Sequence, residues 1–143
     1  MKKRSNKLYA IIYYWLPFLL WVTLIYSFSS HPTNSVSEIY WEDFIVKKLA
    51  HVIEYGILTV FLYRALLYQG LSKKSAGIIS IFFAICYGLT DERHQSFVPG
   101  REPRIRDVFF DTIGALLAIF AIWKLLPKAP KRLRAWAKNM GLV

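Results

Sequence analysis

DERHQSFVPGREPRIRDVFFD, from Asp91 to Asp111, is a highly charged stretch set between two segments that are apolar enough to lie in a lipid bilayer. It carries five of the nine acidic residues of the chain, together with four arginines, His94 and Gln95. Polar chemistry is therefore concentrated here, and charged groups next to membrane helices usually have a function. We expect the rest of the chain to hold this stretch at a membrane surface.

The composition indicates an integral membrane protein. Of the 143 residues, 55% are hydrophobic and 17% are aromatic, which exceeds the usual content of a soluble domain. The length predicts a single domain over residues 1–143. The single cysteine, Cys86, lies in an apolar run and excludes an intrachain disulfide. The net charge of +10 is typical of proteins that bind nucleic acid or an anionic membrane surface.

Four apolar segments predict an all-α fold, an integral membrane four-helix bundle. The expected spans are residues 8–28, 49–68, 75–91 and 108–126. A crossing needs about 20 apolar residues, so we expect the short third span to continue into Thr90–Gln95. The first apolar run is too long for a signal peptide, and Pro17 is expected to kink the helix that it forms.

The charge distribution predicts the orientation. Four spans place both termini on one side, where most of the 19 lysines and arginines fall, so both termini are expected in the cytoplasm. All nine acidic residues then lie on outer loops or in the outer halves of helices. The net charge is thus a topology signal, and nucleic-acid binding is not expected.

The tail, residues 127–143, has no acidic residue and predicts a basic amphipathic helix that lies on anionic inner-leaflet headgroups. Its apolar stripe, at helical spacing, consists of Leu133, Trp136, Ala137 and Met140.

Three helix faces near the predicted outer surface carry the candidate site. Residues at i, i+3 and i+4 share a face of a helix, which groups His51 with Glu54 and Tyr55, and Asp107 with Asp111. The predicted catalytic residues are His51, Glu54, Glu92, Gln95, Asp107 and Asp111, and the predicted substrate-binding residues are Tyr55, Asp91 and Arg101. Arg101 follows a Pro-Gly turn, a placement suited to gripping a phosphate or carboxylate.

Structural roles compete with these assignments. Glu54 could pair with Lys47, Lys48 or a central arginine, and Asp107 could serve only as a favourable charge at a helix N-terminus. In DERHQ, Gln95 and one acid are expected to face the bundle, while Arg93 and His94 point away from it. The alternative is that all of these are solvated charges at a helix end. Arg101 could pair with Glu54 or Asp111.

Paired carboxylates beside a histidine could perform general acid–base chemistry on an amphiphile whose polar head enters between the helices. The same His, Asp and Glu set could bind a divalent metal, but its spacing does not match H-E-x-x-H or a comparably specific pattern, so neither a metal nor another cofactor is expected. A proton-coupled transporter is disfavoured because the predicted inner half has no acid.

Three motifs, KLAHVIEY (48–55), DERHQSFVPGR (91–101) and RDVFFDTIGA (106–115), resemble the VanZ-like family of bacterial membrane proteins over roughly residues 8–123. The resemblance implies a small multi-pass helical protein, and the family's namesake is associated with resistance to the glycopeptide teicoplanin. The polar positions of the family correspond to His51, Glu92, Gln95, Arg101, Asp107 and Asp111.

We therefore expect a protein that acts at the outer face of the cytoplasmic membrane on an envelope lipid or a cell-wall precursor. The alternative is a non-catalytic membrane partner or chaperone whose polar residues form structural salt bridges. Whether substrate is turned over stays open at this stage. Four helices bury little surface, so a homodimer is also plausible.

Overall fold

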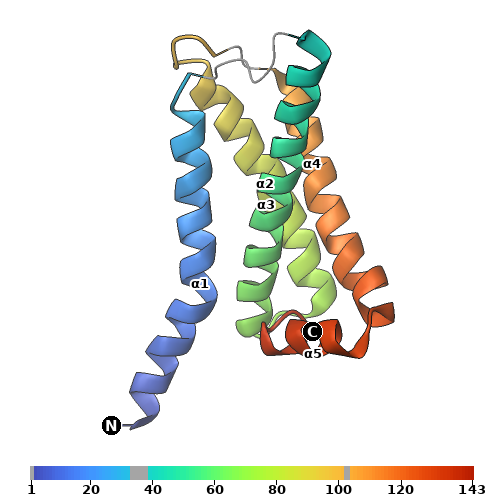
Figure 1. The fold of residues 1–143 in the computed structure, drawn as a ribbon. Helices are drawn as coiled ribbons and strands as arrows, with labels where there is room; N and C mark the ends of the chain where they lie inside the picture. Colours follow the sequence, from blue (N-terminus) through green and yellow to red (C-terminus); the bar gives the residue numbers. More distant parts are fainter. Residues whose placement is uncertain (1, 33–38, 102–103) are drawn as a thin grey trace.

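The computed structural model describes residues 2–32, 39–101 and 104–143, and within them it is all helical, as predicted (Figure 1). Two of the acids assigned to the outer side, Glu38 and Glu102, lie outside the described residues. The helices are α1 (Lys2–Ser29), α2 (Tyr40–Tyr68), α3 (Lys73–Gln95), α4 (Ile105–Phe120) and α5 (Lys131–Asn139). A π-helical turn, Ala121–Leu125, and a 3₁₀ turn, Leu126–Lys128, extend α4.

Three helical segments are long and apolar enough to cross a membrane: Lys7–Ser29, Lys73–Gln95 and Ile105–Lys128. They correspond to the first, third and fourth predicted spans. α2 is not among them; its apolar part carries the ionisable residues His51, Glu54 and Arg64. The second predicted span, 49–68, is the C-terminal part of this longer helix, and its crossing of the bilayer stays a prediction.

The boundaries of α3 show how a short apolar run becomes a full-length helix. The Ser72 hydroxyl accepts a hydrogen bond from the Ser75 N–H at 3.1 Å and caps the N-terminus. At the other end the helix continues through the charged residues DERHQ to Gln95, as expected from the length that a span requires.

Helices α2 and α4 pack closely enough for backbone to meet backbone. A Cβ atom at Gly114 would overlap the Val52 carbonyl oxygen, and one at Gly56 would lie 3.4 Å from the Gly114 carbonyl oxygen. Glycine is therefore required at 114, in the way that small residues allow close packing of membrane helices.

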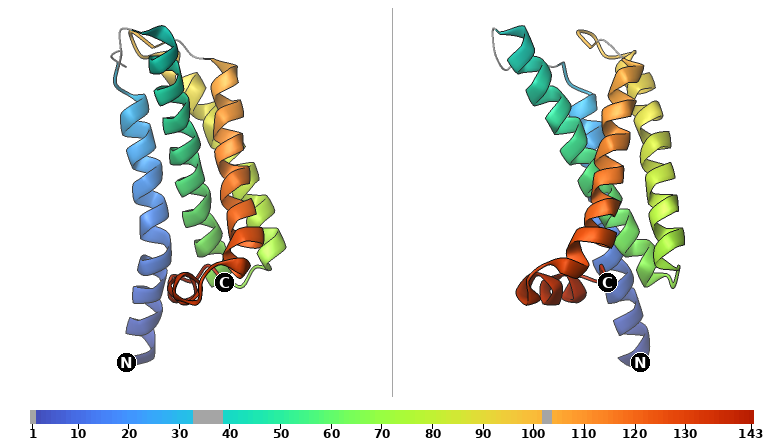
Figure 2. Two further views of the ribbon diagram at one scale, coloured as in Figure 1. Left: turned by 45° about the vertical axis from the view of Figure 1, so that its right-hand side comes forward. Right: turned by 90° about the vertical axis from the view of Figure 1, so that its right-hand side faces the viewer.

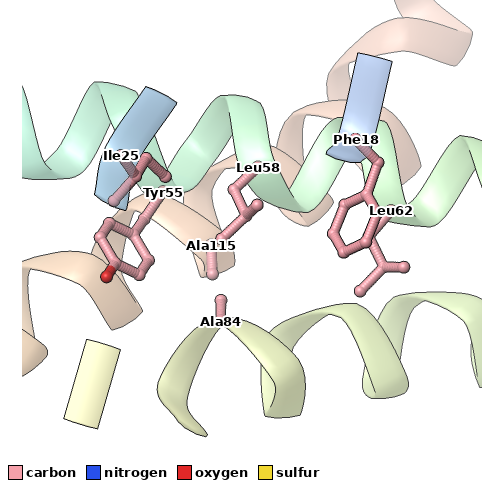
Figure 3. Close-up of a cluster of buried hydrophobic side chains, with 7 residues drawn as sticks. All are labelled: Phe18, Ile25, Tyr55, Leu58, Leu62, Ala84 and Ala115. Atoms are coloured by element: carbon pink, nitrogen blue, oxygen red, sulfur yellow. The ribbon is translucent and has the colours of Figure 1, made fainter. Parts of the chain in front are cut away.

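The core lies where α1, α2, α3 and α4 converge. It contains Phe18, Ile25, Tyr55, Leu58, Leu62, Ala84 and Ala115 (Figure 3). Large apolar side chains also cover the outside, among them Leu20, Phe82 and Phe109, each at least 60% exposed. Apolar surface of this extent is typical of a protein that contacts lipid.

Helix α1 lies on the flank of the bundle and bends along its length, while α5 lies across one end of the molecule (Figures 1 and 2). Pro17 lies inside α1, where it removes one backbone hydrogen bond. Both ends of the chain lie at the end of the molecule that α5 covers. The charged connections between helices lie at the opposite end.

Candidate functional site

A polar cavity of about 460 Å³ lies at the end of the bundle away from the chain termini. We call it the polar cavity. Its walls come from the C-terminal end of α1, the N-terminal half of α2, the end of α3, the α3–α4 connection and the first turn of α4. The charged and polar side chains that line it include Asp43, Lys47, Lys48, His51, Glu54, Asp91, Gln95, Arg101, Arg104 and Asp107. Six of the nine predicted site residues are thus brought together around one cavity.

Buried acid–base pairs join α2 to α4 beside this cavity. Lys48 Nζ lies 2.6 Å from Asp107 Oδ1, and His51 Nδ1 lies 2.8 Å from Asp111 Oδ1. The other ring nitrogen of His51, Nε2, is 4.0 Å from Asp107 Oδ2, too far for a hydrogen bond. Both pairs form at one helix crossing, because the partners on each helix are about one turn apart. We call these four residues the α2–α4 ladder.

Asp111 fixes the orientation of the His51 ring. An ionised carboxylate can only accept a hydrogen bond, so His51 Nδ1 donates to it, and a neutral ring then keeps Nε2 as an acceptor. Asp111 is only 1% exposed. A Cβ atom at Gly88 on α3 would lie 2.8 Å from Asp111 Oδ2, so the glycine leaves room for this carboxylate. A histidine held through one nitrogen and free at the other is arranged as a general base is.

The carboxylate of Glu54 lines the polar cavity and makes no hydrogen bond or ion pair with any residue that the structure describes. The lysines considered as its partners are engaged elsewhere, since Lys47 binds Asp43 at 2.7 Å and Lys48 belongs to the ladder. The Glu54 main chain, by contrast, is held, because its carbonyl oxygen accepts a hydrogen bond from Trp21 Nε1 at 2.8 Å. A fixed backbone therefore presents a free carboxylate to the cavity.

The end of α3 buries two carboxylates, where we expected one. Gln95 Nε2 donates to Asp91 Oδ2 at 2.9 Å, on the cavity side. Glu92 Oε2 accepts from the main-chain N–H of Arg104 at 2.6 Å. Arg104 is the residue immediately before α4. Glu92 thus ties α3 to the start of α4 and is not among the residues that line the cavity.

His94, expected to point away from the bundle, packs against α1 instead. Its Nε2 lies 3.0 Å from Ser30 Oγ, and its ring centroid lies 4.6 Å from that of Tyr26. Arg93 is exposed, as expected.

Arg101 closes the cavity from the loop side. Its Nε donates to the His31 carbonyl oxygen at 2.8 Å, and its Nη2 donates to that of Phe28. The Phe28 carbonyl belongs to the last turn of α1 and the His31 carbonyl lies two residues beyond it, at a helix C-terminus where a cation is favourable. The expected pairing with Glu54 or Asp111 is not formed. Gly100, with φ +80°, makes the turn that delivers the arginine.

Tyr55 and Asp111 do not line the cavity. Tyr55 is fully buried in the core, and its hydroxyl has no hydrogen-bond partner among the described residues (Figure 3). A contact between Tyr55 and a ligand stays a prediction. Asp111 lies behind His51 and reaches the cavity only through it.

Sequence reasoning did not assign Lys48 to the site, nor did it foresee the wall that α1 contributes through Ile25 and Phe28. The signal for Lys48 was its position three residues before His51, on the same helix face. No group of three or more His, Cys, Asp and Glu side chains within the described ranges is arranged to hold a metal ion.

Comparison with known families finds a match. The model of the VanZ/LLP1 family matches residues 3–127. The chain belongs to the VanZ/LLP1 family. The VanZ/LLP1 region includes every predicted site residue and ends before α5. No match was found among the curated proteins or among the solved structures. Family and apolar helices together identify a membrane protein of the VanZ kind.

Proposed function

We propose that this VanZ/LLP1 protein binds the polar head of an envelope lipid or cell-wall precursor in the polar cavity, at the outer face of the cytoplasmic membrane. By binding this lipid or precursor, the protein would contribute to resistance against glycopeptides of the teicoplanin type. The observation that carries the proposal is the free carboxylate of Glu54 on the cavity wall, close to a histidine that Asp111 orients.

The chemistry of the cavity suits a head group with several hydrogen-bonding groups. Its volume of about 460 Å³ lies in the range of small-molecule sites. Glu54 can accept hydrogen bonds from hydroxyl or amine groups of the ligand. His51 Nε2 can accept one more and, in a reaction, can take up a proton. The same geometry therefore serves binding alone or binding followed by proton transfer.

The orientation proposed for the protein places both termini in the cytoplasm, because most of the 19 cations would then lie on that side. In a Cys86→Ser background, a cysteine at Ser96 should react with a membrane-impermeant maleimide added to intact cells. Protection at Ser96 together with reaction at Ser72 would invert the proposed topology.

The function is tested by removing single charges. Glu54→Gln and Asp111→Asn should reach wild-type levels in the membrane and lose the teicoplanin resistance that we expect the wild-type gene to confer on a susceptible host. Glu42→Gln is the matched control, since Glu42 lies on the same helix but does not line the cavity. Full resistance with both variants, at normal protein levels, would overturn the proposal.

A second candidate is a non-catalytic membrane partner or chaperone, which the buried Lys48–Asp107 ion pair favours. If the ladder only holds α2 against α4, the exchange Lys48→Asp with Asp107→Lys should restore a function that each single change removes. Glu54→Gln would then be neutral. Loss with Glu54→Gln supports ligand binding in the cavity instead.

A further inference from the structure

A second pocket, of about 750 Å³, lies at the end of the molecule that carries the chain termini. Its apolar walls are formed by Tyr63, Ile122, Trp123, Leu126 and Leu142. Four cations also line it: Lys73 and Lys74 from the first turn of α3, and Arg134 and Lys138 from α5. We call it the basic pocket.

The cations of the basic pocket have no acidic side chain beside them in the described structure. None of its four cations forms an ion pair within the described ranges. The sequence has no acidic residue after Asp111 and none between Glu54 and Asp91. Arg134 and Lys138 are one helical turn apart and share a face of α5. The N-terminus of α3 adds its partial positive charge at Lys73.

The pocket is part of the folded structure, because α5 is packed against the bundle. Ala137 and Leu142 are buried in a cluster with Tyr63, Ala76 and Ile119. Figures 1 and 2 show α5 lying across the ends of the long helices rather than continuing α4. If the long helices cross the bilayer, α5 lies parallel to its surface, at the level of the headgroups.

We propose that the basic pocket binds one anionic phospholipid of the leaflet that faces the chain termini. Lys73, Lys74, Arg134 and Lys138 would hold the phosphate, and an acyl chain would lie against Trp123. Charge complementarity carries this choice of ligand, since the pocket joins four unpaired cations to an apolar wall. The site lies at the opposite end of the molecule from the polar cavity and is independent of the function proposed there.

The experiment compares phosphatidylglycerol with phosphatidylcholine of the same acyl chains, added to the delipidated full-length protein in detergent and counted as bound lipid by native mass spectrometry. Phosphatidylglycerol should bind tighter by about tenfold or more, because each cation near an anionic headgroup contributes measurably. Arg134→Gln with Lys138→Gln should remove about tenfold of this affinity and leave phosphatidylcholine binding unchanged.

Lys131→Gln with Arg132→Gln is the matched control, because these cations lie on the same helix but do not line the pocket. It should change phosphatidylglycerol affinity less than twofold. If the Arg134 and Lys138 variant fails to fold, Lys73→Gln with Lys74→Gln provides the same test from α3. Equal binding of the two lipids, or an equal loss in the control, would overturn the proposal.

A second readout locates the acyl chain. Phosphatidylglycerol with brominated acyl chains should quench the fluorescence of the wild-type protein more than that of Trp123→Phe. Equal quenching of the two proteins would show that no acyl chain lies in the basic pocket.

Discussion

The two ends of this molecule hold charge in opposite ways. At the polar cavity, Lys48 and His51 pair with buried aspartates of α4 at 2.6 and 2.8 Å. At the basic pocket, four cations have no counterion among the described residues. Charges at the first end therefore hold helices together, whereas charges at the second end are available to a ligand.

Within the polar end, the charged residues also differ in whether the protein provides them with a partner. Buried charges are stable only when paired, and the α2–α4 ladder satisfies that requirement inside the protein. Glu54 is the exception, because its carboxylate lines the cavity without a partner in the described structure. What distinguishes Glu54 is that its carboxylate has neither a counterion nor a hydrogen-bond donor among the described residues, whereas Asp91 and Glu92 accept hydrogen bonds from Gln95 and from the Arg104 main chain.

Breaking the ladder should have the largest effect on stability. Lys48→Ala would leave the Asp107 carboxylate buried without its cation, a loss of about 3–5 kcal/mol in the free energy of unfolding. Lys47→Ala is the control, since Lys47 makes a more exposed i, i+4 pair with Asp43, worth about 0.3–0.5 kcal/mol. Unfolding in mixed micelles measures both. Equal losses would contradict a structural role specific to the ladder.

Replacing either of two glycines, one at each end of the molecule, should have an intermediate effect on stability. Ala at position 88 would crowd Asp111, and Ala at position 77 would crowd Trp123, because its Cβ atom would overlap the indole ring. Each substitution should cost about 1–3 kcal/mol.

Their functional effects should differ, however. Gly88→Ala should impair resistance and spare phosphatidylglycerol binding, and Gly77→Ala should do the reverse. If either variant affected both readouts equally, the two ends would not act independently.

Removing cations from the basic pocket should have the smallest effect on stability. Lys73→Gln with Lys74→Gln should change the free energy of unfolding by no more than about 0.5 kcal/mol, because neither lysine loses an ion-pair partner. The same unfolding assay applies. A loss as large as that of Lys48→Ala would show that these lysines are structural.

Much of the helical fold was predictable, because hydropathy and helix length are properties of local sequence. The continuation of α3 to Gln95 followed from the length that a span requires. The start of α2 at Tyr40 did not, since its first turns are charged and gain their packing from α4, where Phe110 lies 6.3 Å from Phe44 between ring centroids. The crossing of the membrane by α2, the side on which the termini lie and the oligomeric state stay predictions.

The tail, residues 127–143, was also only partly predictable from sequence. Its apolar stripe was predicted as one lipid-facing surface, but Ala137 is buried in the bundle, whereas Leu133 and Trp136 remain exposed. Periodicity identifies a face of a helix and cannot tell which part of that face another helix will cover.

The candidate site was predictable only as a set of helix faces. Spacing placed His51 with Glu54, and Asp107 with Asp111, on single faces. Which acid meets which base depends on how α2 and α4 are rotated and shifted against each other, and the close approach of Gly114 to Val52 is one contact of that arrangement. Hence the pairing of Lys48 with Asp107 could not be read from the sequence.

The anchoring of Arg101 has a consequence for tolerance to mutation. Its two acceptors, the carbonyl oxygens of Phe28 and His31, belong to the main chain. Any residue that preserves the backbone at those two positions keeps the junction between α1 and the α3–α4 connection. The donor side offers no such freedom, because lysine cannot reproduce a planar fork with donors at two nitrogens. The junction thus depends on the identity of one residue out of three.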